Sequence, residues 1–210
     1  VSWSLLDNTG ATVLSGGAPY SGNYVGDGCV YGCMEPFADN YNPLANLEDG
    51  SCLYTNCLAA DTCESFESFA SFPINDGDFN LWQQATDDGG INWQVETNGT
   101  PSFNTGPTAA YDGVNYIFIE TSVTGPGQTA SLYVPCVDLS AWNNPSIVFA
   151  YHMWGVSMGT LALEVSDDGG ASWDSLWAKS GQQGSSPQWF LEGVDLSNYS
   201  GTVAIRFVGT

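Results

Sequence analysis

The amino-acid sequence predicts an all-β sandwich. Short runs rich in β-branched and aromatic residues recur along the chain, turn-forming residues separate them, and no segment has a convincing helical pattern. Two of these runs, residues 146–151 and 160–165, predict a central hairpin with Gly155 and Gly159 near its bend. Because the hairpin is heavily aromatic, we expect it in the middle of the sandwich, covered on both faces.

The composition allows a folded core but is strongly acidic. Hydrophobic residues make up 43% of the 210 residues, which is enough for one sandwich and a smaller module. Two basic residues, Lys179 and Arg206, face 23 acidic residues, and the formal net charge is −21. Binding phosphates needs clustered Lys and Arg, so nucleic acid is excluded as a partner. No apolar run approaches the roughly 20 residues of a membrane span, so membrane insertion is not expected.

Residues 1–28 predict a β-hairpin. Two alternating runs flank the turn signal Asp7-Asn8-Thr9-Gly10. A single hairpin is only marginally stable alone, so we interpret it as the end of an upstream domain. The chain has no initiator Met and no signal peptide, and we therefore expect a piece of a longer secreted protein.

Residues 29–62 predict a small module that disulfides hold together. Five of the six cysteines lie between Cys29 and Cys63, in a stretch rich in turn residues and side-chain oxygens. An even number of cysteines without a Cys-x-x-Cys pair favours disulfides and an extracellular setting over a zinc site. Because residues 32–52 have too few apolar side chains for a core, a disulfide staple and a bound cation are the expected stabilising elements.

Within this module, residues 32–52 resemble a Cys-bracketed repeat related to thrombospondin type 3 calcium repeats. The resemblance rests on Gly32-Cys33, Asn40-Tyr41-Asn42-Pro43 and Asp49-Gly50-Ser51-Cys52, with Glu48 replacing the first Asp of the usual pair. Such repeats occur between domains of secreted bacterial proteins, so the resemblance implies a linker, a bacterial origin and a Cys33–Cys52 disulfide. The calcium ligands that it implies are Asp39, Asn42, Glu48 and Asp49. The alternative is that these side chains only cap turns.

Residues 63–210 carry the main domain, which resembles a MAM domain. The matching motifs, in chain order, are Phe66-Glu67, Trp82, Trp93, Thr105-Gly106-Pro107, the strand at residues 116–120, and Tyr151-His152-Met153-Trp154-Gly155. The resemblance implies a jelly-roll β-sandwich of two antiparallel sheets. The family continues beyond the strand that contains Ile205-Arg206-Phe207, so we expect the domain to be truncated, with its C-terminal strand missing.

The MAM resemblance also implies a disulfide and a cation site. The disulfide would join Cys63 to Cys136, which leaves Cys29 and Cys57 as partners of each other. Acidic residues at the positions near the family's cation site are Glu67, Asp88 and Asp112. Oxygen ligands suit Ca²⁺, and we expect this ion in a structural role.

No constellation predicts catalysis, and we do not expect an enzyme. The pairs Asp87-Asp88 and Asp167-Asp168 lie in Asp-Asp-Gly-Gly turns, where a solvated carboxylate accepts backbone hydrogen bonds instead of acquiring a raised pKa. Residues 166–173 match the Asp-box pattern, which stabilises a hairpin. His152, the only histidine, lies in an aromatic strand, where a hydrogen-bonded core role is the commoner one.

Tryptophans in or beside loops are the candidate ligand-binding residues. An exposed indole offers a sugar ring a flat apolar face and one hydrogen-bond donor. The candidates are Trp142, Trp173, Trp177 and Trp189. The alternative is that these rings pack over the second sheet or the linker.

Together these features predict a non-catalytic recognition or adhesion module of a larger secreted or cell-surface protein. The expected partners are an extracellular glycan or protein and the neighbouring domains of the same chain. Two alternatives come from other classes. The chain could be an accessory or spacer module of a secreted hydrolase, such as a metalloprotease or polysaccharide-degrading enzyme, or a structural repeat of a surface filament.

Overall fold

A computed structural model of the chain describes residues 2–6, 12–17, 30–34, 38–47, 49, 51–53, 57–58, 63–67, 82–85, 91–121 and 127–210. In these residues every regular element is a strand, which confirms the all-β prediction. None of the described segments is a helix that could cross a membrane. The strands are β1 (Ser2–Leu6), β2 (Thr12–Gly17), β3 (Gln83–Gln84), β4 (Trp93–Glu96), β5 (Tyr116–Ile119), β6 (Ala130–Asp138), β7 (Ser146–Tyr151), β8 (Thr160–Ser166), β9 (Asp174–Ser180), β10 (Phe190–Asp195) and β11 (Thr202–Gly209).

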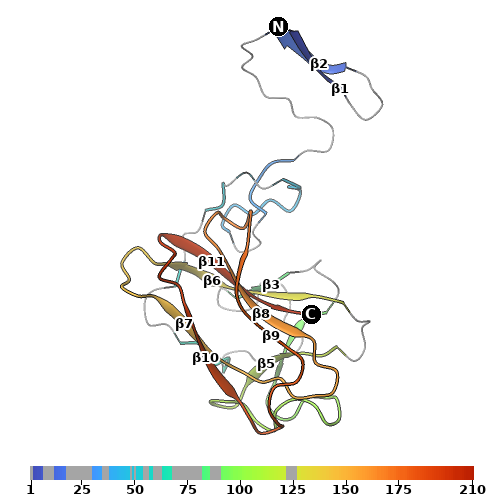
Figure 1. The fold of residues 1–210 in the computed structure, drawn as a ribbon, viewed down its shortest axis with the longest axis vertical. Coiled ribbons are helices and arrows are strands. Elements are labelled where there is room, and N and C mark those ends of the chain that lie inside the picture. The colour runs from blue at the N-terminus through green and yellow to red at the C-terminus, as the bar shows by residue number, and fades with distance from the viewer. Residues whose placement is uncertain are drawn as a thin grey trace.

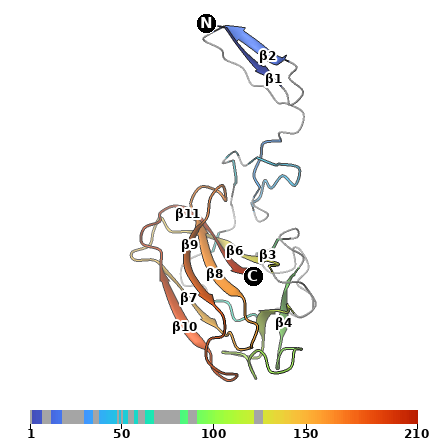
Figure 2. The same ribbon diagram turned by 45° about the vertical axis from the view of Figure 1, so that its right-hand side comes forward.

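The main domain is a sandwich of two antiparallel layers. One layer is a five-stranded sheet in the order β3-β6-β11-β8-β9. The other layer consists of two ribbons, β4–β5 and β7–β10, which Figures 1 and 2 show from two directions. Of the six strand pairs described in the two layers, only β8–β9 and β4–β5 join strands that are consecutive in the chain. This crossing pattern, with the family match described below, confirms the jelly-roll expectation.

Alternation along the strands of the large sheet explains how both ribbons pack on the same face. Leu132 and Val134 are two residues apart in β6 and therefore point the same way. Leu132 belongs to the core cluster that includes β4, and Val134 belongs to the cluster that includes β10. Leu163 and Val165 of β8 have 0% exposure in the second cluster. Burying side chains of this size contributes about 1.5–3 kcal/mol each.

The predicted hairpin between residues 146–151 and 160–165 is wrong, although both segments are strands. β7 pairs with β10, whereas β8 pairs with β11 and β9 in the opposite layer. The connection at residues 152–159 carries the chain from one layer to the other instead of reversing it within a sheet. The ribbon is also open on its outer face, where the exposed fractions are 60% for Val148 and 61% for Leu191.

The N-terminal part contains two of the predicted features. The backbone of β1 pairs with that of β2 from Ser2↔Gly17 to Leu6↔Thr12, so the hairpin prediction is confirmed. Cys33 and Cys52 form the predicted disulfide. The predicted domain boundaries at residues 28 and 62 lie outside the described residues.

The second disulfide corrects the prediction for the remaining cysteines. Cys136 pairs with Cys57 and not with Cys63, so the expected Cys29–Cys57 pairing is also wrong. Leu58 explains the choice, because its N–H donates to Cys136 O at 2.7 Å and the residue forms a parallel bridge with Val137. The chain therefore runs beside β6 at residues 57–58. Cys63 is exposed with a free thiol, and Cys29 lies outside the described residues.

Candidate recognition surface

Three loops meet at the end of the sandwich that is far from the N-terminal hairpin in Figure 1. We call residues 97–115, 152–159 and 181–189 together the three-loop end. Gly106 N donates to Trp154 O at 2.9 Å, and Gln183 N donates to Met153 O at 2.6 Å. Ser186 Oγ donates to Gly106 O at 3.4 Å. Each loop is therefore hydrogen-bonded to the other two.

Gly106 explains the Thr-Gly-Pro motif in the first of these loops. Its φ is +68°, a left-handed conformation that favours glycine. A Cβ at this position would also collide with the side chain of Thr100. Thr100 Oγ1 donates to Thr105 O at 3.0 Å, so the space is filled by a contact that closes the loop. The motif is thus a backbone requirement of the three-loop end.

His152 holds two of the loops together. Its Nε2 lies 2.8 Å from Ser186 O, a geometry in which the ring nitrogen donates to the carbonyl. The ring also packs against Trp189, with 5.3 Å between centroids. Burial lowers the pKa of His152, although the Ser186 and Ser185 carbonyls partly oppose this effect. The neutral, hydrogen-bonded ring fits the structural role that the sequence favoured.

An aromatic cluster surrounds Trp189. Its Nε1 donates to Ala109 O at 3.0 Å, which joins the loop at residues 181–189 to the loop at residues 97–115. The indole makes edge contacts with Tyr111 at 6.2 Å and Tyr116 at 5.9 Å between centroids. The Tyr116 hydroxyl donates to Asn98 O. Burial first, and then the charge of Glu96, raise the pKa of Tyr116 to about 12, so this phenol stays protonated.

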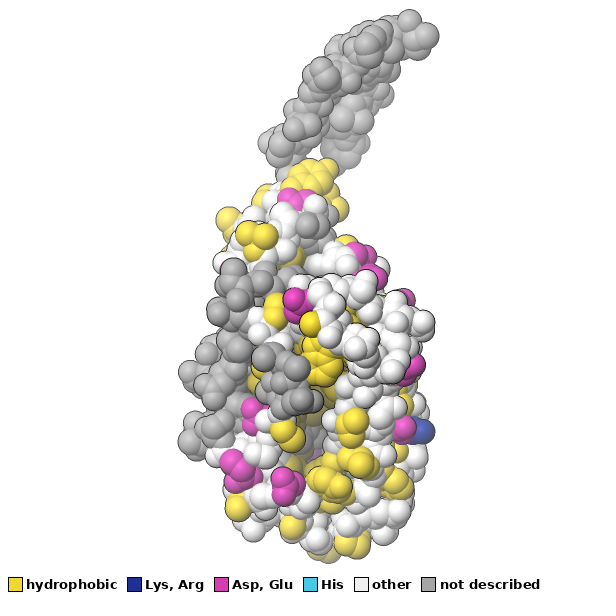
Figure 3. Space-filling view, turned by 90° about the vertical axis from the view of Figure 1, so that its left-hand side faces the viewer, with side chains coloured by type: hydrophobic (Ala, Val, Ile, Leu, Met, Phe, Trp, Pro, Cys, Tyr) yellow, Lys and Arg dark blue, Asp and Glu magenta, His cyan; other side chains and the backbone are white. Residues whose placement is uncertain are grey.

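Several large apolar side chains at the three-loop end are exposed. The exposed fractions are 91% for Phe103, 97% for Val156, 58% for Val114 and 54% for Tyr111. On the face drawn in Figure 3, hydrophobic side chains gather toward the lower end of the sandwich, with acidic side chains among them. Because the loops are hydrogen-bonded to each other, these exposed apolar side chains are held on a prearranged scaffold. Such surfaces are typical of binding sites on rigid scaffolds.

Carboxylates hold the same loops in shape. Glu67 Oε1 accepts hydrogen bonds from Val114 N at 2.7 Å and Asn115 N at 2.8 Å. These two bonds, with the one from Asn115 the stronger influence, lower the pKa of Glu67. Glu96 Oε1 similarly accepts from Thr97 N at 2.8 Å. Both carboxylates therefore fix the backbone through hydrogen bonds from its amides.

The described members of the predicted calcium sites do not form a cation site by themselves. In the described ranges, no group of three or more His, Cys, Asp or Glu side chains gathers closely enough to hold a metal ion. In the Cys-bracketed run, Asn42 Oδ1 accepts from Leu44 N and Asp49 Oδ1 accepts from Ser51 N, which is turn capping. Asp39 and Asp112 are exposed. Glu48 and Asp88 lie outside the described residues, so calcium stays a prediction.

Three of the four predicted ligand-binding tryptophans are in contact with neighbouring rings or charges. Trp177 lies within β9, not in a loop, and makes edge contacts with Phe149 and Tyr151 at 5.0 and 4.9 Å inside the sandwich. The ring of Trp173 lies under Arg206, and Trp189 lies in the cluster described above. Trp142 is half-buried in the loop between β6 and β7. Sugar stacking on these indoles stays a prediction.

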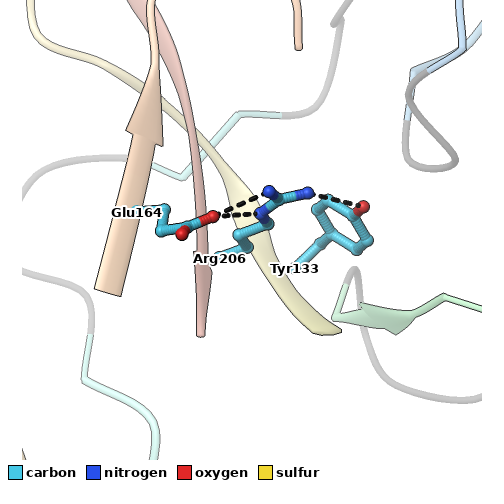
Figure 4. Close-up of polar contacts among 3 residues, drawn as sticks. All are labelled: Tyr133, Glu164 and Arg206. Atoms are coloured by element: carbon cyan, nitrogen blue, oxygen red, sulfur yellow. Dashed lines mark hydrogen bonds and ion pairs between the residues drawn. The ribbon is translucent and has the colours of Figure 1, made fainter. Parts of the chain in front are cut away.

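A polar site on the outer face of the large sheet was not predicted. Figure 4 shows Arg206 between Glu164 and Tyr133, which are its register partners on the two adjacent strands. Arg206 Nη2 lies 2.7 Å from Glu164 Oε2, and its Nη1 lies 3.5 Å from the Tyr133 hydroxyl. The guanidinium also covers the Trp173 ring, at 4.0 Å from its centroid. We call these four residues the Arg206 site.

The Asp-box prediction is confirmed beside that site. Asp168 Oδ1 accepts from Ser172 N at 2.9 Å and from the Ser166 hydroxyl at 2.8 Å. Bonds from Ser172 are the main cause of the lowered pKa of Asp168. The carboxylate therefore closes the turn between β8 and β9 and has no feature of a catalytic acid.

Comparison with known proteins identifies the family. The model of the MAM domain family (MAM domain, meprin/A5/mu) matches residues 70–210. The chain belongs to the MAM domain family. This agrees with the motifs that suggested the resemblance, of which His152, Trp154 and Gly106 together hold the three-loop end of this MAM domain.

Three relatives of this MAM domain come from vertebrates. Neuropilin-1a of Danio rerio is 36% identical over 114 residues, or 52% of this chain. Thyroid hormone-induced protein B of Xenopus laevis is 31% identical over 144 residues and zonadhesin of Sus scrofa 31% over 149, each alignment covering 67% of this chain. The alignments span only 12%, 20% and 6% of the respective relatives. The family match begins at residue 70 and so lies outside the Cys-bracketed repeat, whose thrombospondin-like and bacterial character stays a prediction.

Proposed function

We propose that this MAM domain is a non-catalytic module for extracellular protein recognition, and that the three-loop end is its binding surface. The observation that carries the proposal is the exposure of Phe103 and Val156, 91% and 97%, on loops that are hydrogen-bonded to each other. Large apolar side chains on a fixed surface lose little conformational freedom on binding. More of the free energy gained by burying them therefore appears as affinity than for side chains on mobile loops.

Chemistry at the three-loop end supports binding more than catalysis. A catalytic base must reach a substrate, but His152 is half-buried and its Nε2 is engaged by the Ser186 carbonyl. Glu67 and Glu96 are engaged by backbone amides. The two disulfides and the family relationship support a secreted or cell-surface location. Adhesion, an accessory role beside a hydrolase, and a filament repeat are all compatible proposals for the longer protein.

A protein partner is favoured over a glycan by the state of the tryptophans. Trp173 is covered by Arg206 and Trp177 is packed inside the sandwich, so two of the four candidate stacking rings are engaged by the domain itself. The most exposed large side chains at the three-loop end, Phe103 and Val156, offer no hydrogen bonds to sugar hydroxyls, and Tyr111 offers a single hydroxyl. An apolar protein surface is their better complement.

The test is a binding screen with a matched control. The chain is passed over immobilised panels of purified extracellular proteins and of neutral and anionic polysaccharides. We expect saturable binding to a protein, weakened at least tenfold by Phe103→Ser with Val156→Ser. The control pair, Val148→Ser with Leu191→Ser on the β7–β10 face, removes exposed apolar side chains elsewhere and should stay within twofold.

Two outcomes would overturn the proposal. Binding to polysaccharides alone, abolished by Trp142→Ala, would assign the domain to glycan recognition. Equal losses in the two variant pairs would show that the three-loop end has no special role. Circular dichroism and thermal melting of every variant exclude misfolding as the cause, since exposed substitutions of this kind change stability by only about 0.5 kcal/mol.

A further inference from the structure

None of the three loops contains a basic residue, although Lys179 of β9 lies two residues before Gly181. The chain's only basic residues are Lys179 and Arg206, and neither lies in residues 97–115, 152–159 or 181–189. Lys179 Nζ lies 6.0 Å from the centroid of Trp177, and Arg206 is bound to Glu164. With a formal net charge of −21, the whole surface attracts cations.

Aromatic rings and carboxylates combine at one corner of the three-loop end. Tyr111, Tyr116 and Trp189 form the edge-contact cluster, and Tyr111 is 54% exposed. Glu96 is the cross-strand partner of Tyr116 in the β4–β5 ribbon, and the exposed Asp112 follows Tyr111 in the chain. We call these five residues the aromatic–acidic corner.

The corner has the residue types of the Arg206 site without the cation. In the Arg206 site, a guanidinium fills the space between an indole, a phenol and a carboxylate. The corner has an indole, two phenols and two carboxylates; Tyr111 is exposed whereas Tyr116 is only 4% exposed, and the described cation–ring contacts of Lys179 and Arg206 are made with other rings. Glu96 Oε1 accepts from Thr97 N and Asn98 N, which fixes the carboxylate but leaves its negative charge uncompensated.

From this geometry we propose that the aromatic–acidic corner receives a Lys or Arg side chain of the protein partner. The inference rests on the proposed recognition function and names the chemistry of its partner. A cation over an aromatic face gains about 0.5–2 kcal/mol, and a charge-assisted hydrogen bond to a carboxylate adds to it. The neighbouring Phe103 and Val156 would contact apolar residues beside the cation.

The charge of the chain decides against a second copy as the occupant. Two copies at −21 each repel one another, and both basic residues of a copy already have aromatic or carboxylate neighbours. A basic partner is instead drawn toward the acidic surface before contact. The occupant is therefore a cationic protein segment with apolar residues around its Lys or Arg.

The first experiment uses three short peptides that differ at one residue. Acetylated Gly-Leu-X-Leu-Gly amides with X as arginine, lysine or citrulline are titrated into the full chain by calorimetry at 20 and 150 mM NaCl. Citrulline keeps the shape of arginine but has no charge. We expect the arginine and lysine peptides to bind at least tenfold more tightly than the citrulline peptide, and more weakly at the higher salt concentration.

The second experiment separates the corner from the general negative charge. Tyr111→Leu and Asp112→Asn should each lower the affinity for the arginine peptide about threefold to tenfold. Asp195→Asn removes one exposed carboxylate on β10, away from the corner, and should change the affinity less than twofold. Equal weakening by Asp195→Asn, or equal binding of the arginine and citrulline peptides, would overturn the inference.

The two proposals fail in different ways. Phe103→Ser and Val156→Ser could abolish binding of a partner protein while Tyr111→Leu and Asp112→Asn leave its affinity unchanged. In that case the proposed recognition function is supported and the cationic corner is wrong. If none of these four substitutions affects any partner, the three-loop end is not the recognition surface and both proposals are wrong. If both pairs of substitutions weaken partner binding, and the arginine peptide binds more tightly than the citrulline peptide, both proposals are supported.

Discussion

The Arg206 site and the aromatic–acidic corner use the same groups in two different ways. In the Arg206 site, the indole of Trp173, the hydroxyl of Tyr133 and the carboxylate of Glu164 surround a guanidinium from the same chain. At the corner, Trp189 contacts Tyr111 and Tyr116, and none of the described cation–ring contacts involves these three rings. The first arrangement is electrostatically complete and contributes to the fold. The second keeps its charge available for another molecule.

Their positions in the sandwich explain the difference. Arg206, Glu164 and Tyr133 lie at paired positions on three adjacent strands, so the backbone register alone brings them together. The corner is assembled from the β4–β5 ribbon and two loops, with Trp189 Nε1 donating to a carbonyl 80 residues away. Strand register suits a permanent contact, whereas joined loops present side chains outward. The comparison leads to tests in order of expected effect.

The largest expected effect is on the Arg206 site. Arg206→Met should lower the free energy of unfolding by about 2 kcal/mol. Glu164 loses its ion-pair partner in a partly buried position, and Trp173 loses its cation–π contact with the guanidinium. Exposure of roughly a fifth of both side chains keeps the loss below that of a fully buried pair. Urea denaturation at pH 7 measures it.

Two control variants sharpen the Arg206 test. Arg206→Lys should lose less, because lysine keeps the charge but lacks the planar fork that contacts carboxylate, ring and phenol together. Lys179→Met removes the other basic residue, which has no described ion pair, and should change stability by less than about 0.5 kcal/mol. Equal losses for Arg206→Met and Lys179→Met would show that only net charge matters, and the contrast between the two sites would then be invalid.

Much of the fold was predictable because local patterns determine it. Residues 146–151 and 160–165 are strands, as their composition indicated, and β1 pairs with β2 as expected. The pairing of β7 with β10 was not predictable from local sequence, since the decision between a hairpin and a crossover depends on which core each strand enters. Family resemblance implied the jelly roll but did not prevent this error.

The disulfide and the site illustrate the same limit. The Cys33–Cys52 pair closes a short local loop and was predicted, whereas Cys57–Cys136 depends on a parallel bridge between segments 79 residues apart. Trp189 was chosen as a binding residue for its loop position, but Tyr111, Tyr116 and Glu96 were missed. Only the folded backbone brings these residues beside it, and no spacing in the sequence indicates that contact.

A moderate effect is expected from calcium, which offers the corner an alternative cation. Asp112 belongs both to the predicted calcium ligands and to the corner, so the ion and the peptide should compete. With a dissociation constant of about 0.5 mM, typical of extracellular modules, 5 mM Ca²⁺ would stabilise the fold by about 1.4 kcal/mol. We expect a higher melting temperature than in EGTA and an affinity for the arginine peptide that is lowered by about threefold to tenfold, the effect expected of Asp112→Asn.

Magnesium at the same ionic strength is the control, because Mg²⁺ gives up its water reluctantly and should have a smaller effect. An unchanged melting temperature in calcium would show that the calcium prediction is wrong. A higher melting temperature with an unchanged peptide affinity would instead exclude Asp112 as a ligand. In that case the comparison between the two aromatic sites would hold without modification.

The smallest effect concerns the carboxylate that shapes the loop below the corner. The folded-state pKa of Glu67 lies below its ordinary value of 4.5, because Asn115 N and Val114 N donate to the carboxylate. A lowered folded pKa means that the folded state binds protons less readily than the unfolded state. The stabilisation is therefore present above pH 4.5 and is lost as the pH falls through the folded pKa. Glu67→Gln should remove this part of the acid dependence and slightly lower the melting temperature at pH 7.

Melting curves between pH 3 and 7 test the Glu67 prediction against Asp112→Asn, whose carboxylate has no described hydrogen bond to the loop. Only Glu67→Gln should reduce the fall of the melting temperature as the pH is lowered from 7 to 3. Glu67→Gln should also lower the affinity for the arginine peptide, although Glu67 is not part of the corner. A loop that lacks the two amide bonds to Glu67 holds Tyr111 less firmly. If Glu67→Gln reduced the acid dependence of the melting temperature but left the peptide affinity unchanged, the rigidity of the loop would be irrelevant to binding. The corner would then act through its charge alone, and the Tyr111→Leu substitution should have no effect either.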